Sequence, residues 1–228
     1  MTWCDRLLQV VLPAYCPGCA TPAVGLCAGC RAGLQPPPAA GPPDGVDWWV
    51  SAFAYQDALR DLVARAKYRG ARTGWSWLAE VLAEVVAEAG GAPSLHVVTW
   101  PPTTLARRRE RGFDQAEWLA RRVAGHLSLP AAALLRRRSG PAQTGRDRRS
   151  RAEHGPAFVA HPAAQGTRLL VVDDVATTGA TLASAARALR VGGAVTVAAA
   201  TAARTPPPGH RPKNYQGRLK APSLDADF

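Results

Sequence analysis

The sequence predicts an α/β domain built on a parallel sheet, preceded by a small metal-binding module. From residue 48 to residue 201, apolar segments that suit strands alternate with amphipathic segments that suit helices. Such alternation is typical of parallel strands joined by helical crossovers. All five cysteines lie within the first 30 residues, which predicts a separate module there. The 228 residues suffice for one ordinary domain and a smaller unit.

Four of the cysteines form two CxxC units, Cys16 with Cys19 and Cys27 with Cys30. Paired CxxC units supply the four thiolates that a tetrahedral Zn²⁺ requires, and the metal would provide folding energy that so short a module lacks. A redox pair is the alternative, but two tandem units without a thioredoxin-like βαβ context favour zinc. Residues 1–34 are therefore predicted to form a short helix, over residues 3–12, and a structural zinc module. The remaining Cys4 is interpreted as a buried apolar residue of that helix.

The elements that follow are assigned from composition and periodicity. Residues 35–47 contain five prolines and are interpreted as a semi-rigid linker. The domain that follows is expected over residues 48–204, and a flexible tail over residues 205–228. Strands are predicted over 48–55, 95–100, 131–135, 167–175 and 194–201, and helices over 57–68, 75–89, 113–126 and 180–190. A basic loop is expected after Pro101 and Pro102, and an irregular basic segment over 136–151.

The charge balance restricts the classes of partner. The chain has 28 basic and 17 acidic residues, a net charge of +11, and only three of the basic residues are lysines. Arginine binds phosphate bidentately, so the excess suggests nucleic acid, a phosphorylated small molecule or an acidic partner. A GC-rich genome would explain arginine in place of lysine but not the net charge. The sequence shows neither a membrane-spanning apolar run nor a signal peptide, so we expect a cytoplasmic protein.

The segment from residue 169 to residue 181, LLVVDDVATTGAT, carries the clearest chemistry. An apolar strand ends in Asp173 and Asp174, and a glycine-containing loop with several hydroxyl groups leads into a helix. Ligands of open α/β sheets bind at this end of the strands, and helix N-termini attract phosphate. A phosphate site beside carboxylates that can hold sugar hydroxyls or Mg²⁺ describes a ribose 5-phosphate, and with a leaving pyrophosphate, phosphoribosyl pyrophosphate (PRPP). A capping pair and a plain turn are the alternatives for the two halves of the segment.

The same segment resembles the PRPP-binding motif of type I phosphoribosyltransferases. Together with the CxxC units, Ala66-Lys67-Tyr68-Arg69-Gly70, Pro101-Pro102 and Arg111-Gly112-Phe113-Asp114-Gln115-Ala116, it resembles the ComF family, although the family's usual asparagine is Asp114 here. The resemblance implies a phosphoribosyltransferase-type Rossmann-like domain behind a zinc module, and a link to DNA uptake in natural transformation. It also implies ligand-binding roles for Asp173, Asp174, Ala176, Thr177, Thr178, Gly179, Ala180, Thr181, Pro101, Pro102, Lys67 and Arg69.

Two arginine clusters are candidates for contact with single-stranded DNA, or else solvated basic loops. They contain Arg107, Arg108, Arg109 and Arg111 in the first, and Arg136, Arg137, Arg138, Arg148 and Arg149 in the second. No acceptor-recognising segment is evident. Three functions therefore stay open: a PRPP-binding accessory of DNA uptake, an active Mg²⁺-dependent phosphoribosyltransferase, and an adaptor whose zinc module contacts competence-system proteins.

Overall fold

The computed structural model describes residues 15–23, 25–68, 72–138 and 156–206. The helix expected over residues 3–12, Cys4, Arg69, Arg148, Arg149 and nearly all of the expected tail lie outside the described residues. In chain order the elements are α2 (Ala28–Ala32), β1 (Trp48–Ala54), α3 (Asp57–Tyr68), α4 (Arg72–Glu88), the 3-10 turn η1 (Ala92–Ser94), β2 (Val97–Thr99), α5 (Leu105–Arg111), α6 (Gln115–His126), β3 (Leu135–Arg137), β4 (Phe158–Ala160), the 3-10 turn η2 (Pro162–Ala164), β5 (Arg168–Ala176), α8 (Ala180–Val191) and β6 (Thr196–Arg204).

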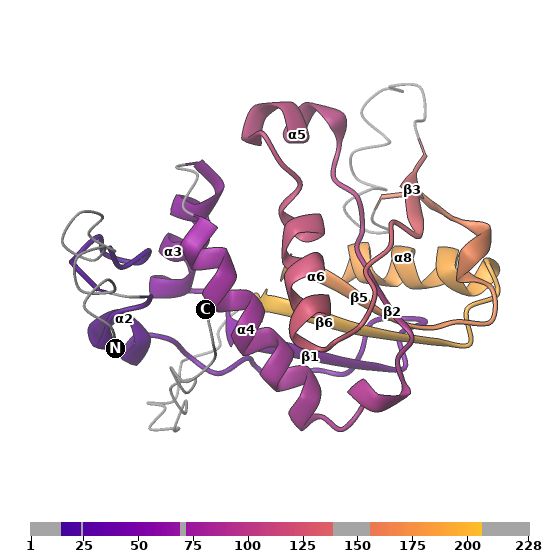
Figure 1. Cartoon of the computed structure of the whole chain (residues 1–228), viewed down its shortest axis with the longest axis horizontal. Helices are drawn as coiled ribbons and strands as arrows, with labels where there is room; N and C mark the ends of the chain where they lie inside the picture. Colours follow the sequence, from indigo (N-terminus) through magenta and orange to yellow (C-terminus); the bar gives the residue numbers. More distant parts are fainter. Residues whose placement is uncertain (1–14, 24, 69–71, 139–155, 207–228) are drawn as a thin grey trace, which may run out of the picture.

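The predicted fold class is confirmed by a sheet of four parallel strands in the order β1-β6-β5-β2. β5 and β6 are the central strands, with Asp173 opposite Thr201 and Ala176 opposite Arg204. Helices α4 and α6 cover one face of the sheet, and α8 with the β3-β4 hairpin covers the other (Figure 1). The carboxyl ends of β2 and β5 therefore open at the same edge of the sheet.

Strand β5 is apolar at successive positions because both of its faces are buried, as expected for a parallel sheet with helices on both sides. Leu170 and Val172 pack into the core beneath α4 and α6, whereas Leu169 and Val171 pack into the core beneath α8. β6 alternates in the same way but carries mainly alanines, all of them buried. A central strand with such short side chains lets helices on both faces approach the sheet.

Two segments differ from the sequence-based expectation. The basic loop after Pro102 contains the short helix α5, which begins at its N-cap Thr104 and ends at Gly112 with φ +77°. A left-handed residue of this kind is a common helix stop. The strand expected over 131–135 is a single bridge between Ala131 and Val98, and the next strand, β3, begins at Leu135 and pairs antiparallel with β4.

The cysteine module and the proline-rich linker both lie against the α/β domain. Cys16, Leu26 and Leu34 are buried in the same core as α4 and α6. The linker follows the edge of the sheet, where Ala54 N–H donates to Gln35 O at 2.9 Å and Val46 is buried beneath α8. Among the described residues, no helix combines the length and apolar character needed to cross a membrane.

Candidate ligand-binding site and cysteine cluster

A cavity of about 470 Å³ lies at the carboxyl edge of the sheet. Asp173, Asp174 and Thr181 contribute one part of its wall, from the end of β5 and the start of α8. The loop after β2 contributes another part, and three arginines contribute the positive charge. The loop residues are Pro101, Pro102 and Thr103, and the arginines are Arg107, Arg111 and Arg137. The cavity thus combines two carboxylates with guanidinium groups from α5 and β3.

The loop between β5 and α8 has the features of an anion-binding turn. Gly179 is the N-cap of α8 with φ +75° and offers no side-chain acceptor to the first amides of the helix. Those amides and the helix dipole favour a negatively charged ligand. Thr177 and Thr178 are exposed, and the Thr178 hydroxyl accepts from Ala180 N–H at 3.3 Å. The residues from Ala176 to Thr181 are referred to below as the phosphate loop.

Asp114 joins the start of α6 to the loop that follows β2. Its Oδ1 accepts from Ala116 N–H at 3.1 Å and Glu117 N–H at 3.3 Å, which caps α6. Its Oδ2 accepts from Thr103 N–H at 2.8 Å, in the loop that follows β2. The side chain is buried. The negative charge that Asp114 adds in place of the usual amide is therefore held by three backbone donors.

Gln115, which the predicted site residues omit, forms a polar pair in the cavity wall with Arg111, which the sequence placed among the candidate DNA contacts. Arg111 Nη1 donates to Gln115 Oε1 at 2.9 Å, which orients the amide. Gln115 is only 3% exposed, and within the described part of the chain neither its Nε2 nor Arg111 Nε has a hydrogen-bond partner. Unsatisfied buried donors cost stability, so their presence beside a cavity indicates a place for a ligand oxygen. The i, i+4 spacing of the two residues was the available signal.

The other predicted ligand and nucleic-acid residues are dispersed. Lys67 lies in the last turn of α3, and its side chain is outside what the structure describes. Arg108 and Arg109 are exposed on α5, which stands away from the sheet (Figure 1). Arg107 and Arg111, placed with them by sequence, face the cavity instead. Arg136 and Arg138 line other hollows beside β3 and β4.

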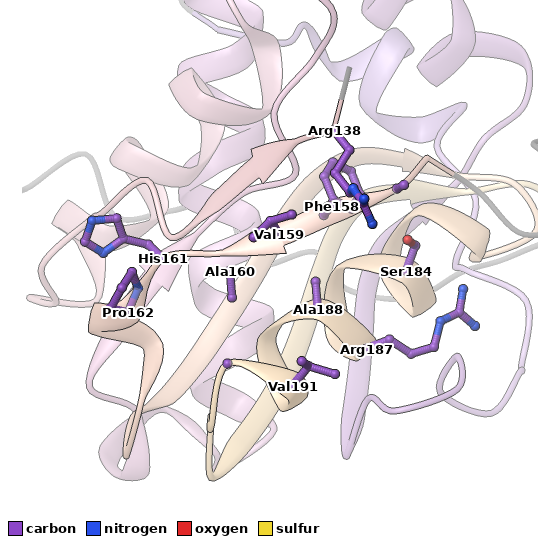
Figure 2. A pocket seen from close by; sticks show the side chains of 12 residues that line it. Arg138, Phe158, Val159, Ala160, His161, Pro162, Ser184, Arg187, Ala188 and Val191 are labelled. Atoms are coloured by element: carbon purple, nitrogen blue, oxygen red, sulfur yellow. The ribbon is translucent and has the colours of Figure 1, made fainter. Parts of the chain in front are cut away.

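The largest of these hollows, about 610 Å³, lies between β4 and α8. Figure 2 shows Ala160 of β4 and Ala188 of α8 pointing toward one another across it. Its lining is mostly apolar, with Arg138, Arg187 and His161 at the rim and no carboxylate among the described lining residues. It therefore lacks the paired charges that distinguish the cavity at the end of β5.

The four predicted metal ligands meet in one cluster. The sulfur atoms of Cys16, Cys19, Cys27 and Cys30 lie within 4.8 Å of one another, and those of Cys19 and Cys27 are 3.5 Å apart. Ligands about 2.3 Å from a tetrahedral Zn²⁺ require sulfur separations near these values. Gly18 is needed here because a Cβ atom would lie 2.8 Å from Cys30 Sγ. The donor set and its spacing fit a zinc ion.

The ionisation of the thiols depends on their hydrogen bonds. The side chain and backbone of Thr21 lower the pKa of Cys19 to about 6. Burial, together with the neighbouring thiols, raises the pKa of Cys30. Four adjacent thiolates repel one another unless a cation lies among them, and a bound metal would deprotonate Cys30 as well.

These features define a phosphoribosyltransferase-fold protein with a four-cysteine module, and comparison with known proteins agrees. The phosphoribosyl transferase domain family matches residues 114–225. The chain is 30% identical over 146 residues to the competence protein ComFC of Bacillus subtilis, covering 61% of this chain and 56% of that protein. It is also 30% identical over 192 residues to the DNA utilization protein YhgH of Salmonella typhimurium, covering 81% of each. The chain belongs to the ComF family, which these two proteins represent.

Among solved structures, the fold is similar to a glutamine PRPP amidotransferase from B. subtilis, with a TM-score of 0.39 at 21% identity over 56% of this chain and 26% of that chain. It is also similar to a purine phosphoribosyltransferase from Pyrococcus horikoshii, with a TM-score of 0.38 at 20% identity over 60% of this chain and 78% of the other. The chain spans about half of the length of ComFC and about a quarter of the amidotransferase.

Proposed function

We propose that the protein binds PRPP with Mg²⁺ in the cavity at the end of β5 and serves as an accessory protein of DNA uptake. The observation that carries the proposal is the joint lining of this cavity by Asp173, Asp174 and Thr181 with Arg107 and Arg111. Carboxylates suit ribose hydroxyls and Mg²⁺, whereas guanidinium groups suit phosphate oxygens. PRPP carries both kinds of group in one small molecule.

The roles within the cavity follow from chemistry and position. The 5-phosphate would bind the phosphate loop, where the N-cap residue Gly179 has no side chain to compete for the free amides of α8. Asp173 and Asp174 would accept from the ribose hydroxyls. Arg111 and the Gln115 amide would donate to the oxygens of the pyrophosphate or of a related group, which would satisfy the buried Nε2.

Calorimetric titration with PRPP, with and without Mg²⁺, tests the proposal. Wild-type protein is expected to bind only with Mg²⁺, and Asp173→Ala/Asp174→Ala is expected to lose binding. The matched control is Asp61→Ala/Glu88→Ala, which removes two exposed carboxylates, one from α3 and one from the end of α4. Absence of binding by folded, zinc-loaded wild-type protein, or equal binding by both double variants, would contradict the proposal.

A second candidate function, contact with single-stranded DNA, is favoured by α5. Arg108 and Arg109 are exposed on this helix, close in sequence to the arginines of the cavity. Backbone contacts of this kind release counterions, so oligonucleotide affinity should fall steeply with salt. Arg108→Ala/Arg109→Ala should reduce that slope, and an unchanged slope would exclude α5 as the contact.

Two further properties belong to the proposal. Zn²⁺ is the metal proposed for the cysteine cluster, and the reduced thiols it needs are maintained in the cytoplasm. Transfer of the phosphoribosyl group to a nitrogenous acceptor is the alternative to binding alone. Pyrophosphate release from PRPP in a panel of bases and amines, with Asp173→Ala/Asp174→Ala as the control, distinguishes an active enzyme from a binding protein.

A further inference from the structure

The proline-rich linker, residues 35–47, contacts the phosphate loop. A Cβ atom placed on Gly179 would lie 2.9 Å from Cγ and 3.3 Å from Cβ of Pro43. Gly179 is buried although the neighbouring Thr177 and Thr178 are exposed. The pyrrolidine ring of Pro43 therefore covers the turn of the loop that leads into α8.

Arg204 at the end of β6 holds the middle of the linker. Its guanidinium group donates to the carbonyl oxygens of Pro38 and Ala40, and its Cζ lies 4.4 Å from the centre of the Trp49 ring. Arg204 is only 8% exposed, so these contacts are shielded from water. A planar guanidinium can make both carbonyl contacts and the ring contact at once, whereas a lysine cannot.

The same end of β6 also holds the start of the phosphate loop. Arg204 is paired with Ala176 in the sheet, and Thr205 N–H donates to Ala176 O at 2.9 Å. The linker and the phosphate loop are thus hydrogen-bonded to two adjacent residues at the end of β6, Arg204 and Thr205. Any displacement of the linker at Pro43 would remove the only proline ring that contacts Gly179 within the described residues.

The far end of the linker is attached to α8. Val46 N–H donates to Pro43 O at 3.0 Å, closing a turn in which Gly45 has φ +79°. Arg190 of α8 forms an ion pair with Asp47 and donates to Gly45 O. Because α8 begins at the phosphate loop, the turn around Pro43 is held against the helix that carries the loop.

We propose that Pro43 is a positioning residue that holds the phosphate loop in its ligand-binding conformation, with Arg204 anchoring the linker behind it. This inference rests on the proposed function, since it concerns the phosphate subsite of the same cavity. Ordering a loop on binding costs conformational entropy, and a loop that is ordered beforehand avoids that cost. The linker thereby adds affinity without touching the ligand.

Two measurements on the full zinc-loaded chain test the inference, and both compare Pro43→Ala with Pro42→Ala, the adjacent and exposed proline. In the first, hydrogen exchange of the backbone amides over residues 176–183 is followed without ligand. Pro43→Ala is expected to accelerate this exchange and Pro42→Ala to leave it unchanged. In the second, PRPP affinity with Mg²⁺ is expected to fall about tenfold in Pro43→Ala, equivalent to about 1.4 kcal/mol.

The outcomes separate the two proposals. Equal exchange in the two proline variants would overturn the inference whether or not PRPP binds. Faster exchange in Pro43→Ala with unchanged PRPP affinity would also overturn it, because the loop would then be ordered without benefit to the ligand. If wild-type protein does not bind PRPP at all, the proposed function fails, and the exchange measurement alone decides whether Pro43 orders the loop. Arg204→Lys should reproduce the Pro43→Ala exchange pattern.

Discussion

The three hydrogen bonds of Asp114 allow a quantitative prediction for the wall of the cavity. Asp114→Ala removes the N-cap of α6, which typically costs about 1 kcal/mol. It also removes the carboxylate that accepts from Thr103 N–H, a bond to a charged group that contributes about 1.5–3 kcal/mol. Because Thr103 is half-buried, solvent recovers part of the second loss. We expect Asp114→Ala to lower the free energy of unfolding by about 2–4 kcal/mol.

Asp114→Asn divides this effect between the two contacts. Its remaining carbonyl oxygen can still cap α6, but its amide group faces Thr103 N–H as a donor and cannot accept from it. We expect a loss of about 1–2 kcal/mol for this variant. A loss as large as that of Asp114→Ala would mean that the link to Thr103, not the cap, dominates.

Urea unfolding followed by tryptophan fluorescence measures both variants, with Asp61→Ala as a control that removes an exposed carboxylate from α3. The control should change the free energy of unfolding by less than about 0.5 kcal/mol. An equally small change in Asp114→Ala would refute the reasoning, because it would show that the buried carboxylate contributes nothing to joining α6 and the loop after β2.

Three further predictions concern other sites. Gln115→Glu should keep the bond from Arg111 and the fold, yet weaken PRPP binding at least about tenfold by placing a carboxylate where a donor was free; calorimetry with undiminished affinity would disprove the donor role. Removal of metal by a chelator, or Cys19→Ser, should release one zinc per chain and lower the thermal midpoint by several degrees, about 4 °C or less for each kcal/mol of stability lost. A midpoint insensitive to chelation would exclude a structural metal. Burial and then the charges of Glu80 and Glu88 raise the pKa of Glu84, so its charged form is disfavoured in the folded state. Glu84→Gln should therefore raise the free energy of unfolding slightly at pH 7, by no more than about 0.5 kcal/mol, and this gain should vanish below the ordinary carboxyl pKa. Thermal melts in which the gain grows on acidification would contradict this sign.

The strands and helices of the α/β domain were largely predictable because their signals are local. The apolar run of β5 is buried on both faces, and the periodic apolar positions of α4, α6 and α8 match their buried faces. Helix α5 was missed because four of its seven residues are arginine and none of them is buried, so no apolar periodicity marks it. Its signals are the cap at Thr104 and the stop at Gly112, which are easily taken for features of a loop.

The candidate site was predictable only in part, for a similar reason. The carboxylates and the phosphate loop are contiguous in sequence, so the strand, turn and helix around them can be recognised together. Gln115, Arg111 and Arg107 enter the same cavity only because β2 lies beside β5 in the sheet. Sequence therefore grouped Arg107 and Arg111 with the exposed Arg108 and Arg109, from which the fold separates them.

By itself, the sequence determined the α/β class, the grouping of the four cysteines and the strand, turn and helix around the phosphate loop, since each depends on spacing along a short stretch of chain. The tertiary structure alone decided which polar groups complete the cavity and what lies against the loop. Arg204 and Pro38, for example, are 166 residues apart and meet only because β6 is a central strand beside β1. Contacts of this kind depend on strand order and helix packing. These bring together residues that are far apart in the chain, and the sequence around either residue does not indicate the other.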